Sequence, residues 1–311
     1  MAAPAVTVAI AVKDRRALIE RCLDAVVTQT VPGGLEVIVV DNGSTDGTYE
    51  HLLARAEGSP VPLRVLRDDG PLGRVRNVAV DAADAPIVAF TDSDCVPAPG
   101  WLAALVAPLA DPPVGVVQGR TEPEPTVPQG RWSATQRLTE LTGRYETCNI
   151  AYRTEALRAA GGFDESVGFF GEDTAAGWAV RRAGWRPAFA PEALVHHAVT
   201  HPGLAWHLRR ARGYRNWNAL VRRFPELRDE LLWRRWFLRP SSAAFTAAAA
   251  GLLLAPWRRG LLALALPYAW LRRPRGRYRS DLVDVAGAIA FDGAVFAGLL
   301  EGSLRERTLV L

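Results

Sequence analysis

The sequence has few of the residues on which several common kinds of site depend. Lys13 is its only lysine, and its three cysteines, Cys22, Cys95 and Cys148, lie far apart. No pair of cysteines has the spacing of a metal site, and no disulfide framework is implied. Neither G-x-G-x-x-G nor G-x-x-x-x-G-K-S/T occurs. This excludes the usual dinucleotide-binding and P-loop phosphate-binding loops.

Acidic residues are scarce in one long stretch. Residues 201–280 contain 17 arginines but only three acidic residues. A basic stretch beside apolar runs favours contact with an anionic membrane surface. Nucleic acid is the rival partner. We expect none, because the sequence has no RNP, zinc-finger or aromatic-interleaved basic pattern.

Three apolar runs lie in the C-terminal third of the chain. Residues 240–257 and 260–271 are 18 and 12 uncharged residues, and a third run at 282–300 includes Asp284 and Asp292. A helix needs about 20 apolar residues to span a bilayer. The first two runs together predict a re-entrant or tightly spanning hairpin with arginines at its foot, as the positive-inside rule expects. Two soluble helices packed on the main domain are the alternative.

Predicted strands and helices alternate through the first half of the chain. The apolar runs that predict strands lie at 6–12, 35–40, 63–66 and 86–91, and the predicted helices lie at 15–29, 47–57, 75–84 and 99–110. Such alternation indicates βαβ units and an α/β fold with a mainly parallel sheet. Further strands are predicted at 114–119 and 193–199, and a long basic helix follows Pro202 to about Arg223.

Carboxylates follow two of the predicted strands. Asp41 comes directly after the strand at 35–40, and Asp92 and Asp94 follow the strand at 86–91 in "IVAFTDSDCV". Ligands of α/β proteins bind at the carboxyl ends of strands. Residues two apart in a strand share a face, where two like charges repel unless a cation lies between them. Mg²⁺ and Mn²⁺ favour such oxygen ligands. A polar turn after the strand is the plain alternative.

One class of phosphate-handling enzyme can be set aside. Phosphatases of the haloacid-dehalogenase type also place D-x-D-x-T/V at the end of a strand, and "DSDCV" matches that pattern. They need a downstream lysine to hold the phosphoryl group. No lysine follows Lys13.

An ordered set of motifs resembles the family-2 glycosyltransferases. The motifs span roughly residues 6–200, and each is weak alone, but their shared order is highly specific. They are "VTVAIAVKDR", "EVIVVDNGSTDGT" (36–48), "GRVRNVAV" (73–80), "IVAFTDSD", "CNIAYRTEALRAAGGFDES" (148–166) and "GEDTAAGWAVRRAGWR" (171–186). The resemblance implies the GT-A fold, a Rossmann-like, mainly parallel sheet flanked by helices.

The resemblance also implies roles in binding the donor, a nucleoside-diphosphate sugar. Asp41 is expected to bind the nucleotide base. Asp92 is expected to face the ribose or the metal region, and Arg76 matches a cation that the family places near the nucleotide.

Further roles concern the metal and the acceptor. Asp94 is expected to ligate a divalent cation, Mn²⁺ or Mg²⁺, which neutralises the departing nucleoside diphosphate. His197 aligns best with a histidine that completes the metal site, and His196 is the alternative. Asp173 is expected to be the general base that deprotonates the acceptor hydroxyl. Glu172 is expected to tune Asp173 or to bind the acceptor.

The sequence therefore predicts an inverting, metal-dependent glycosyltransferase that transfers a sugar to an acceptor hydroxyl. The Q-x-x-R-W motif of processive synthases is absent, which favours single addition. Residues 1–200 are predicted to form the catalytic domain, with a nucleotide-sugar half at 1–98 and an acceptor half at 99–200. Residues 201–311 are predicted to form a basic helix, an apolar hairpin and a C-terminal helix.

Two other functions and two locations stay open. A nucleotidyltransferase would share a similar nucleotide-binding half, and an inactive scaffold would keep the fold without its chemistry. The basic and apolar C-terminal region predicts the cytoplasmic face of the cell membrane and makes a lipid-linked molecule a candidate acceptor. A soluble cytoplasmic protein is the alternative.

Overall fold

The computed structural model describes residues 3–130, 132–167, 170–273 and 280–311. The chain forms two compact units, Met1–Gln129 with Ala134–Thr200 and Gly130–Ser133 with His201–Leu311. The assignment of a nucleotide-sugar half and an acceptor half within residues 1–200 stays a prediction.

The first unit is built on one eight-stranded sheet in the order β3-β2-β1-β4-β7-β6-β8-β5. The strands are β1 Val6–Val12, β2 Leu35–Asp41, β3 Leu63–Arg67, β4 Ile87–Thr91, β5 Cys95–Pro97, β6 Val114–Pro123, β7 Asn149–Arg153 and β8 Arg186–His197. The first four in that order are parallel, and β6 is parallel to β8. β7 runs antiparallel to β4 and β6, and β5 runs antiparallel to β8. The predicted α/β fold with a mainly parallel sheet is confirmed.

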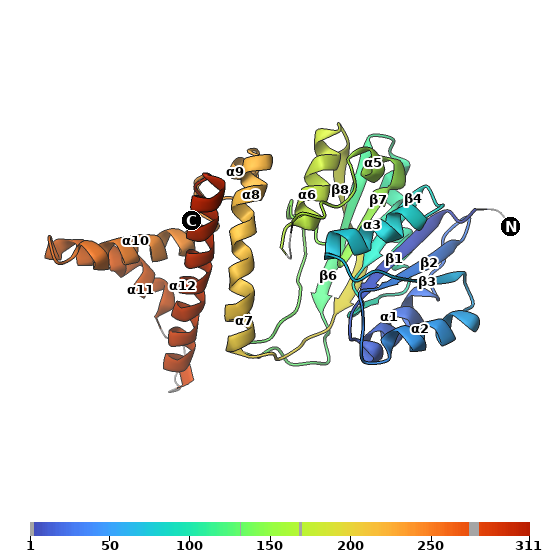
Figure 1. Cartoon of the computed structure of the whole chain (residues 1–311), viewed down its shortest axis with the longest axis horizontal. Helices are drawn as coiled ribbons and strands as arrows, with labels where there is room; N and C mark the ends of the chain where they lie inside the picture. The colour runs from blue at the N-terminus through green and yellow to red at the C-terminus, as the bar shows by residue number, and fades with distance from the viewer. Residues whose placement is uncertain (1–2, 131, 168–169, 274–279) are drawn as a thin grey trace. The chain divides into compact units, whose positions relative to one another are not determined.

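Helices cover both faces of this sheet, with α1 and α2 on one side and α3, α5 and α6 on the other (Figure 1). They are α1 Arg16–Val26, α2 Thr48–Glu57, α3 Leu72–Ala82, α4 Trp101–Val106 with the 3₁₀ turn η1 Ala107–Ala110, α5 Thr154–Ala159 and α6 Glu172–Arg182. Because the central strands are covered on both faces, they are nearly continuous apolar runs instead of alternating ones. Every residue of β2 is buried, for example.

The second unit is helical. Its elements are α7 Leu204–Ala211, the 3₁₀ turn η2 Arg212–Arg215, α8 Asn216–Arg223, α9 Leu227–Glu230, α10 Pro240–Leu254, the 3₁₀ segment η3 Arg259–Ala265, α11 Leu266–Arg272 and α12 Ser280–Glu306. The single basic helix predicted after Pro202 is instead α7 and α8 joined by η2. Gly213 lies in η2, and glycine is a poor α-helix former.

The apolar runs form helices of different length. Among the described residues, one helix is long and apolar enough to cross a membrane, Leu282–Glu306, and it lies in the third run, not in the predicted hairpin. This is weak evidence for a span, since core helices of soluble proteins can be equally long and apolar. The hairpin consists of α10, η3 and α11. α10 has 15 residues, about 22 Å at 1.5 Å each, which is shorter than a bilayer core of about 30 Å.

Candidate active site

The two carboxylates of the D-x-D motif lie at the turn between β4 and β5. Ser93 and Asp94 form the turn, and the Cys95 amide donates to the Asp92 carbonyl at 3.0 Å. The expectation that Asp92 and Asp94 share one face of a strand is therefore wrong, because the strand ends at Thr91. Asp94 is buried, whereas Asp92 is partly exposed. The turn lets the two carboxylates meet different partners.

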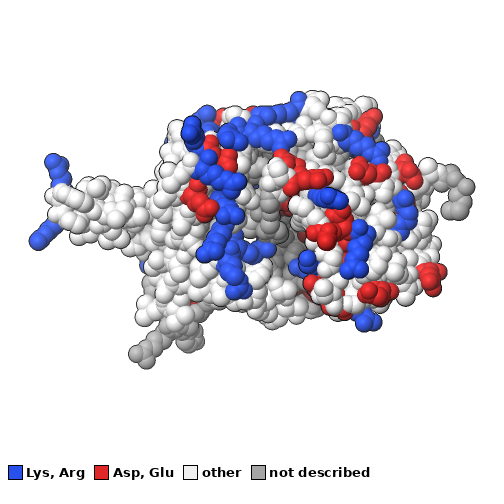
Figure 2. Space-filling view, viewed as in Figure 1, with Lys and Arg blue, Asp and Glu red and all other residues white. Residues whose placement is uncertain are grey.

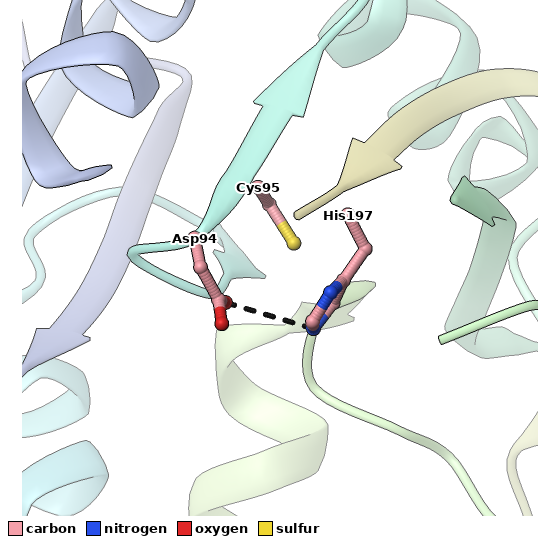
Figure 3. Close-up of side chains that lie close together, drawn as sticks. All are labelled: Asp94, Cys95 and His197. Carbon is pink, nitrogen blue, oxygen red and sulfur yellow. Dashed lines mark ion pairs between the residues drawn. The ribbon is translucent and has the colours of Figure 1, made fainter. Parts of the chain in front are cut away.

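Asp94 is brought to His197 by the pairing of two short strand segments. β5 pairs antiparallel with β8, so that Cys95 lies opposite His197, and the Ala198 amide donates to the Asp94 carbonyl at 2.8 Å. Asp94 Oδ1 lies 3.6 Å from His197 Nε2 (Figure 3). Asp94, Cys95 and His197 form a buried group whose possible ligand atoms lie within 4.8 Å of one another.

The structure separates the two candidate histidines. Neighbouring residues of a strand point to opposite faces, so only one of the pair can face Asp94. That one is His197. Its Nδ1 lies 2.9 Å from the Ala198 carbonyl oxygen. A proton on Nδ1 would satisfy this carbonyl and leave Nε2 free as a ligand.

Asp94 and His197 fit a divalent cation. A carboxylate oxygen and a neutral imidazole nitrogen are both ligands that Mn²⁺ accepts. The third member, Cys95, fits less well, because burial raises the pKa of its thiol well above the usual value. A neutral thiol is not a ligand for Mg²⁺ or Mn²⁺. Cys95 therefore forms part of the wall beside the proposed cation.

Arg15 is a member of the site that the sequence analysis did not single out. Its guanidinium pairs with Asp94 Oδ2, on the other side of the carboxylate from His197. The residue ends the first motif, "VTVAIAVKDR", in the loop that follows β1. That position at the carboxyl end of a strand could have drawn attention to it.

Arg76 connects the D-x-D turn to the start of α6, where the predicted base lies. This buried arginine on α3 donates from Nη1 to Glu172 Oε1 at 2.6 Å, and its Nη2 lies 3.9 Å from Asp92 Oδ1. Glu172 and Asp173 occupy the first turn of α6, where the helix dipole favours negative charge. The structure thus gives Glu172 a buried cationic partner, and the expected role of Glu172 toward the acceptor stays a prediction.

The pKa of Asp173 is raised well above the usual range of an aspartate. The main cause is its removal from bulk water, and the neighbouring Glu172 charge adds to it, while Arg76 opposes it. Its Oδ1 accepts a hydrogen bond from the Thr174 amide at 2.7 Å. A carboxylate with a raised pKa is a stronger proton acceptor, which suits a general base. Another carboxyl raises this pKa further, that of Glu146, which no sequence motif indicated.

Asp41 ends β2 with a fully buried side chain. Its Oδ1 accepts from the Ser44 amide at 3.0 Å and lies 3.4 Å from Arg67 Nε. Its Oδ2 is buried and has no hydrogen-bond partner in the described part of the chain. A buried carboxylate oxygen without a donor is costly, so this atom fits an N–H group supplied by a ligand. The geometry suits the expected contact with a nucleotide base.

Comparison with known proteins identifies the family. Residues 7–163 match the model of "Glycosyl transferase family 2", and residues 87–273 match that of "Glycosyl transferase family group 2". The chain is 33% identical over 178 residues to the Pre-mycofactocin glycosyltransferase of Mycobacterium tuberculosis, which covers 53% of this chain and 37% of the relative. It is 36% identical over 157 residues to Glycosyltransferase AglE of Haloferax volcanii, covering 49% and 50%. The chain thus spans half or less of the length of these curated relatives.

Solved structures give the same fold. A Pyrobaculum calidifontis mannosyltransferase in complex with GDP-Man and Mn²⁺ is 25% identical, with a TM-score of 0.62 over 98% of this chain and 87% of that one. S. aureus TarS in complex with UDP-GlcNAc is 17% identical, with a TM-score of 0.52 over 97% and 92%, which shows the fold alone. The chain therefore belongs to glycosyl transferase family 2 and has the GT-A-like fold.

Proposed function

We propose that this chain is an inverting, divalent-cation-dependent transferase that moves one sugar from a nucleoside-diphosphate sugar to an acceptor hydroxyl. The observation that carries the proposal is the link between two groups of side chains. Asp94 and His197 would provide one oxygen and one nitrogen ligand, since Oδ1 and Nε2 lie 3.6 Å apart. Arg76 joins the neighbouring Asp92 to the start of α6, where Asp173 has a raised pKa.

The donor side of the proposal uses residues at the carboxyl ends of the strands. Asp41 would accept a hydrogen bond from the nucleotide base through its unpaired Oδ2. Asp94 and His197 would hold Mn²⁺ or Mg²⁺, and the bound cation would supply positive charge against the diphosphate leaving group. Arg76 would keep Asp92 oriented toward the donor. The structures bound to GDP-Man and to UDP-GlcNAc support a nucleotide-sugar donor but leave its base and sugar open.

The acceptor side of the proposal depends on Asp173. Its carboxylate would take the proton of the acceptor hydroxyl while that oxygen forms a bond to the anomeric carbon. The bond between the anomeric carbon and the diphosphate oxygen breaks in the same step, and its electron pair leaves with the diphosphate. Attack from the face opposite the leaving group inverts the anomeric configuration. The absence of Q-x-x-R-W supports one addition per acceptor.

A panel of nucleotide sugars tests this proposal. The full chain is incubated with each donor in Mn²⁺ or in EDTA, and release of nucleoside diphosphate is measured. One donor should turn over, only with the cation, and proton NMR of the first product should show the inverted anomer. Cation-independent turnover, or a retained anomer, would contradict the proposal. A variant of an exposed ion pair remote from these side chains, Asp111→Asn, serves as the control for general damage to the fold.

The acceptor is proposed to be lipid-linked, on the strength of the apolar arm formed by α10, η3 and α11. Its large side chains are unusually exposed, among them Leu253 at 73% and Trp257 at 78%. α10 carries no charged residue, is rich in alanine and leucine, and buries only Ala248 and Gly251. Soluble surfaces rarely keep such a contiguous apolar area, which marks an interaction site.

Basic residues lie at both ends of this arm. Arg258 and Arg259 follow α10, while Arg272 ends α11 and Arg273 follows it. In Figure 2 the surface over α10 carries almost no charge apart from basic side chains at one end. Arg273 stacks on Trp270, 4.2 Å from the ring centroid. Tryptophan and arginine together favour the headgroup region of an anionic bilayer. We therefore propose that the protein lies on the cytoplasmic face of the membrane, with the arm in the interface instead of spanning.

A further inference from the structure

Asp94 has two cationic or polar neighbours on opposite sides of its carboxylate. His197 faces Oδ1, and Arg15 pairs with Oδ2. The two members of the Arg15–Asp94 ion pair differ in burial. The Asp94 side chain is 9% exposed, and the Arg15 side chain is 43% exposed. If the pair opened, water would solvate the guanidinium, whereas the carboxylate would be left buried without a positive partner. Breaking such a pair is costly for the buried member.

The backbone of Arg15 is fixed in place. Asp14, with a φ of 50°, donates from its amide to Ser44 Oγ at 2.9 Å, and its Oδ1 accepts from the Thr45 amide at 2.7 Å. The Arg15 carbonyl then accepts from the amides of Leu18 and Ile19 at the start of α1. The loop after β1 is thereby tied to the loop after β2. The fold therefore fixes the backbone position from which the Arg15 side chain reaches Asp94.

A divalent cation at Asp94 and His197 would compete with this arginine. A guanidinium and a metal ion on the same carboxylate repel each other, so binding of one disfavours the other. The half-exposed Arg15 side chain is the mobile partner. A diphosphate bound at the cation would present charged oxygens, which guanidinium groups bind well.

We propose that Arg15 holds the Asp94 carboxylate before the cation binds and moves to the diphosphate when the nucleotide arrives. Arg15 is then a positioning residue that couples cation binding to nucleotide binding. The coupling favours loading of the two together over binding of the cation alone. This proposal rests on the proposed cation site and goes beyond it, because it predicts the order and the linkage of binding.

Titration of Mn²⁺, followed through the electron paramagnetic resonance signal of the free ion, tests the proposal without any turnover. The full-length parent, Arg15→Gln and the control Arg64→Gln are compared with and without UDP or GDP. Arg64 is a matched control, since it is 41% exposed and pairs with the buried Glu36 near the opposite ends of the strands. Thermal melting checks folding, and Arg15→Met keeps the apolar stem should the glutamine variant melt early.

Without nucleotide, both Arg15 variants should bind Mn²⁺ about five-fold tighter than the parent, the gain expected from removing one half-exposed ion pair. The Arg64 control should bind like the parent. Whichever of UDP and GDP binds to the protein should tighten Mn²⁺ binding more in the parent than in the Arg15 variants. Equal or weaker Mn²⁺ binding by the Arg15 variants would overturn this inference alone. If Asp94→Asn leaves Mn²⁺ binding unchanged, or if the parent binds no Mn²⁺, the proposed cation site is overturned as well.

Discussion

A single position along β8 decides which histidine takes part in the site. His197 lies beside Asp94, while His196 faces the other side of the strand with a buried Nδ1 that has no partner among the described residues. We predict that His197→Ala weakens Mn²⁺ binding by about ten-fold or more, since it removes a ligand, and that His196→Ala changes it little. Isothermal titration with Mn²⁺ measures both. A larger loss in the His196 variant would reverse the assignment.

Asp173 illustrates how the carboxylate proposed as the general base opposes stability. Its pKa is raised in the folded protein, so the fold binds its proton more tightly than the unfolded chain does. The stability that goes with this proton is complete below the unfolded pKa and is lost as pH rises through the folded pKa. At neutral pH, which lies above the unfolded pKa, the raised pKa of this group therefore destabilises the fold.

Replacement by the neutral isostere should remove that penalty. We predict that Asp173→Asn melts about 2 °C or more above the parent at pH 7.5, and that the difference shrinks as pH falls toward 4. Differential scanning calorimetry over this pH range is the measurement. A variant that melts below the parent at pH 7.5 would show that the carboxylate is stabilised by its surroundings instead.

At the scale of elements, short strands set the site. β5 has three residues and ends in Pro97, yet its pairing with β8 brings Asp94 to His197. Sequence patterns predict long buried strands such as β1 and β2, because their apolar runs are local. They miss β5, since three residues give no periodicity and its partner lies about a hundred residues away. The link between Arg76 and Glu172 was missed for the same reason: it joins distant segments.

The side chain of one asparagine links the neighbouring strands β6, β7 and β8. Asn149 accepts from Trp101 Nε1 at 2.8 Å and donates to the carbonyls of Arg120 and Ala193, each at 2.8 Å. Gly119 lies directly against it, and a Cβ there would come within 2.3 Å of Asn149 Oδ1. Glycine is needed at this position because of that close approach and not because of its φ angle.

A side chain added at Gly119 should crowd Asn149 and lower the free energy of unfolding. We predict that Gly119→Ala costs about 1–3 kcal/mol, the usual range for overpacking, and lowers the melting temperature. Gly58→Ala is the control, since a Cβ at that position meets nothing within 4 Å. Urea unfolding of both variants provides the comparison. Equal stability of the two would mean that Asn149 moves aside without loss.

At the scale of the whole chain, composition alone did not distinguish the apolar runs. The predicted hairpin forms the exposed arm, whereas the third run forms the long helix α12. Within its own unit, α12 pairs Glu301 with Arg215 at 3.0 Å, and Ser303 Oγ accepts from Asn218 at 2.9 Å. These polar contacts favour α12 as a packing helix of this unit. A run of apolar residues in the sequence does not show which tertiary partners the helix will have.

The membrane assignment predicts binding to vesicles through the arm. Full-length protein should float with vesicles containing anionic phosphatidylglycerol and bind much less to neutral phosphatidylcholine, because arginine contacts depend on anionic headgroups. Leu253→Glu with Trp257→Glu should abolish flotation. Leu53→Glu on α2 is the control, since Leu53 is also exposed. A parent protein that stays monodisperse and does not float at low salt would refute the membrane assignment and favour a soluble acceptor.

The central claim is that Asp173 accepts the proton of the acceptor while Asp94 and its neighbours bind the donor. The most direct test is to measure turnover and nucleoside-diphosphate affinity in Mn²⁺ for the parent, Asp173→Asn and the control Asp111→Asn. The account predicts that Asp173→Asn keeps the parent's affinity but loses about 10²–10⁴-fold in turnover, as expected for a missing general base. Unchanged turnover together with weaker nucleotide binding would contradict it and make Asp173 a binding residue.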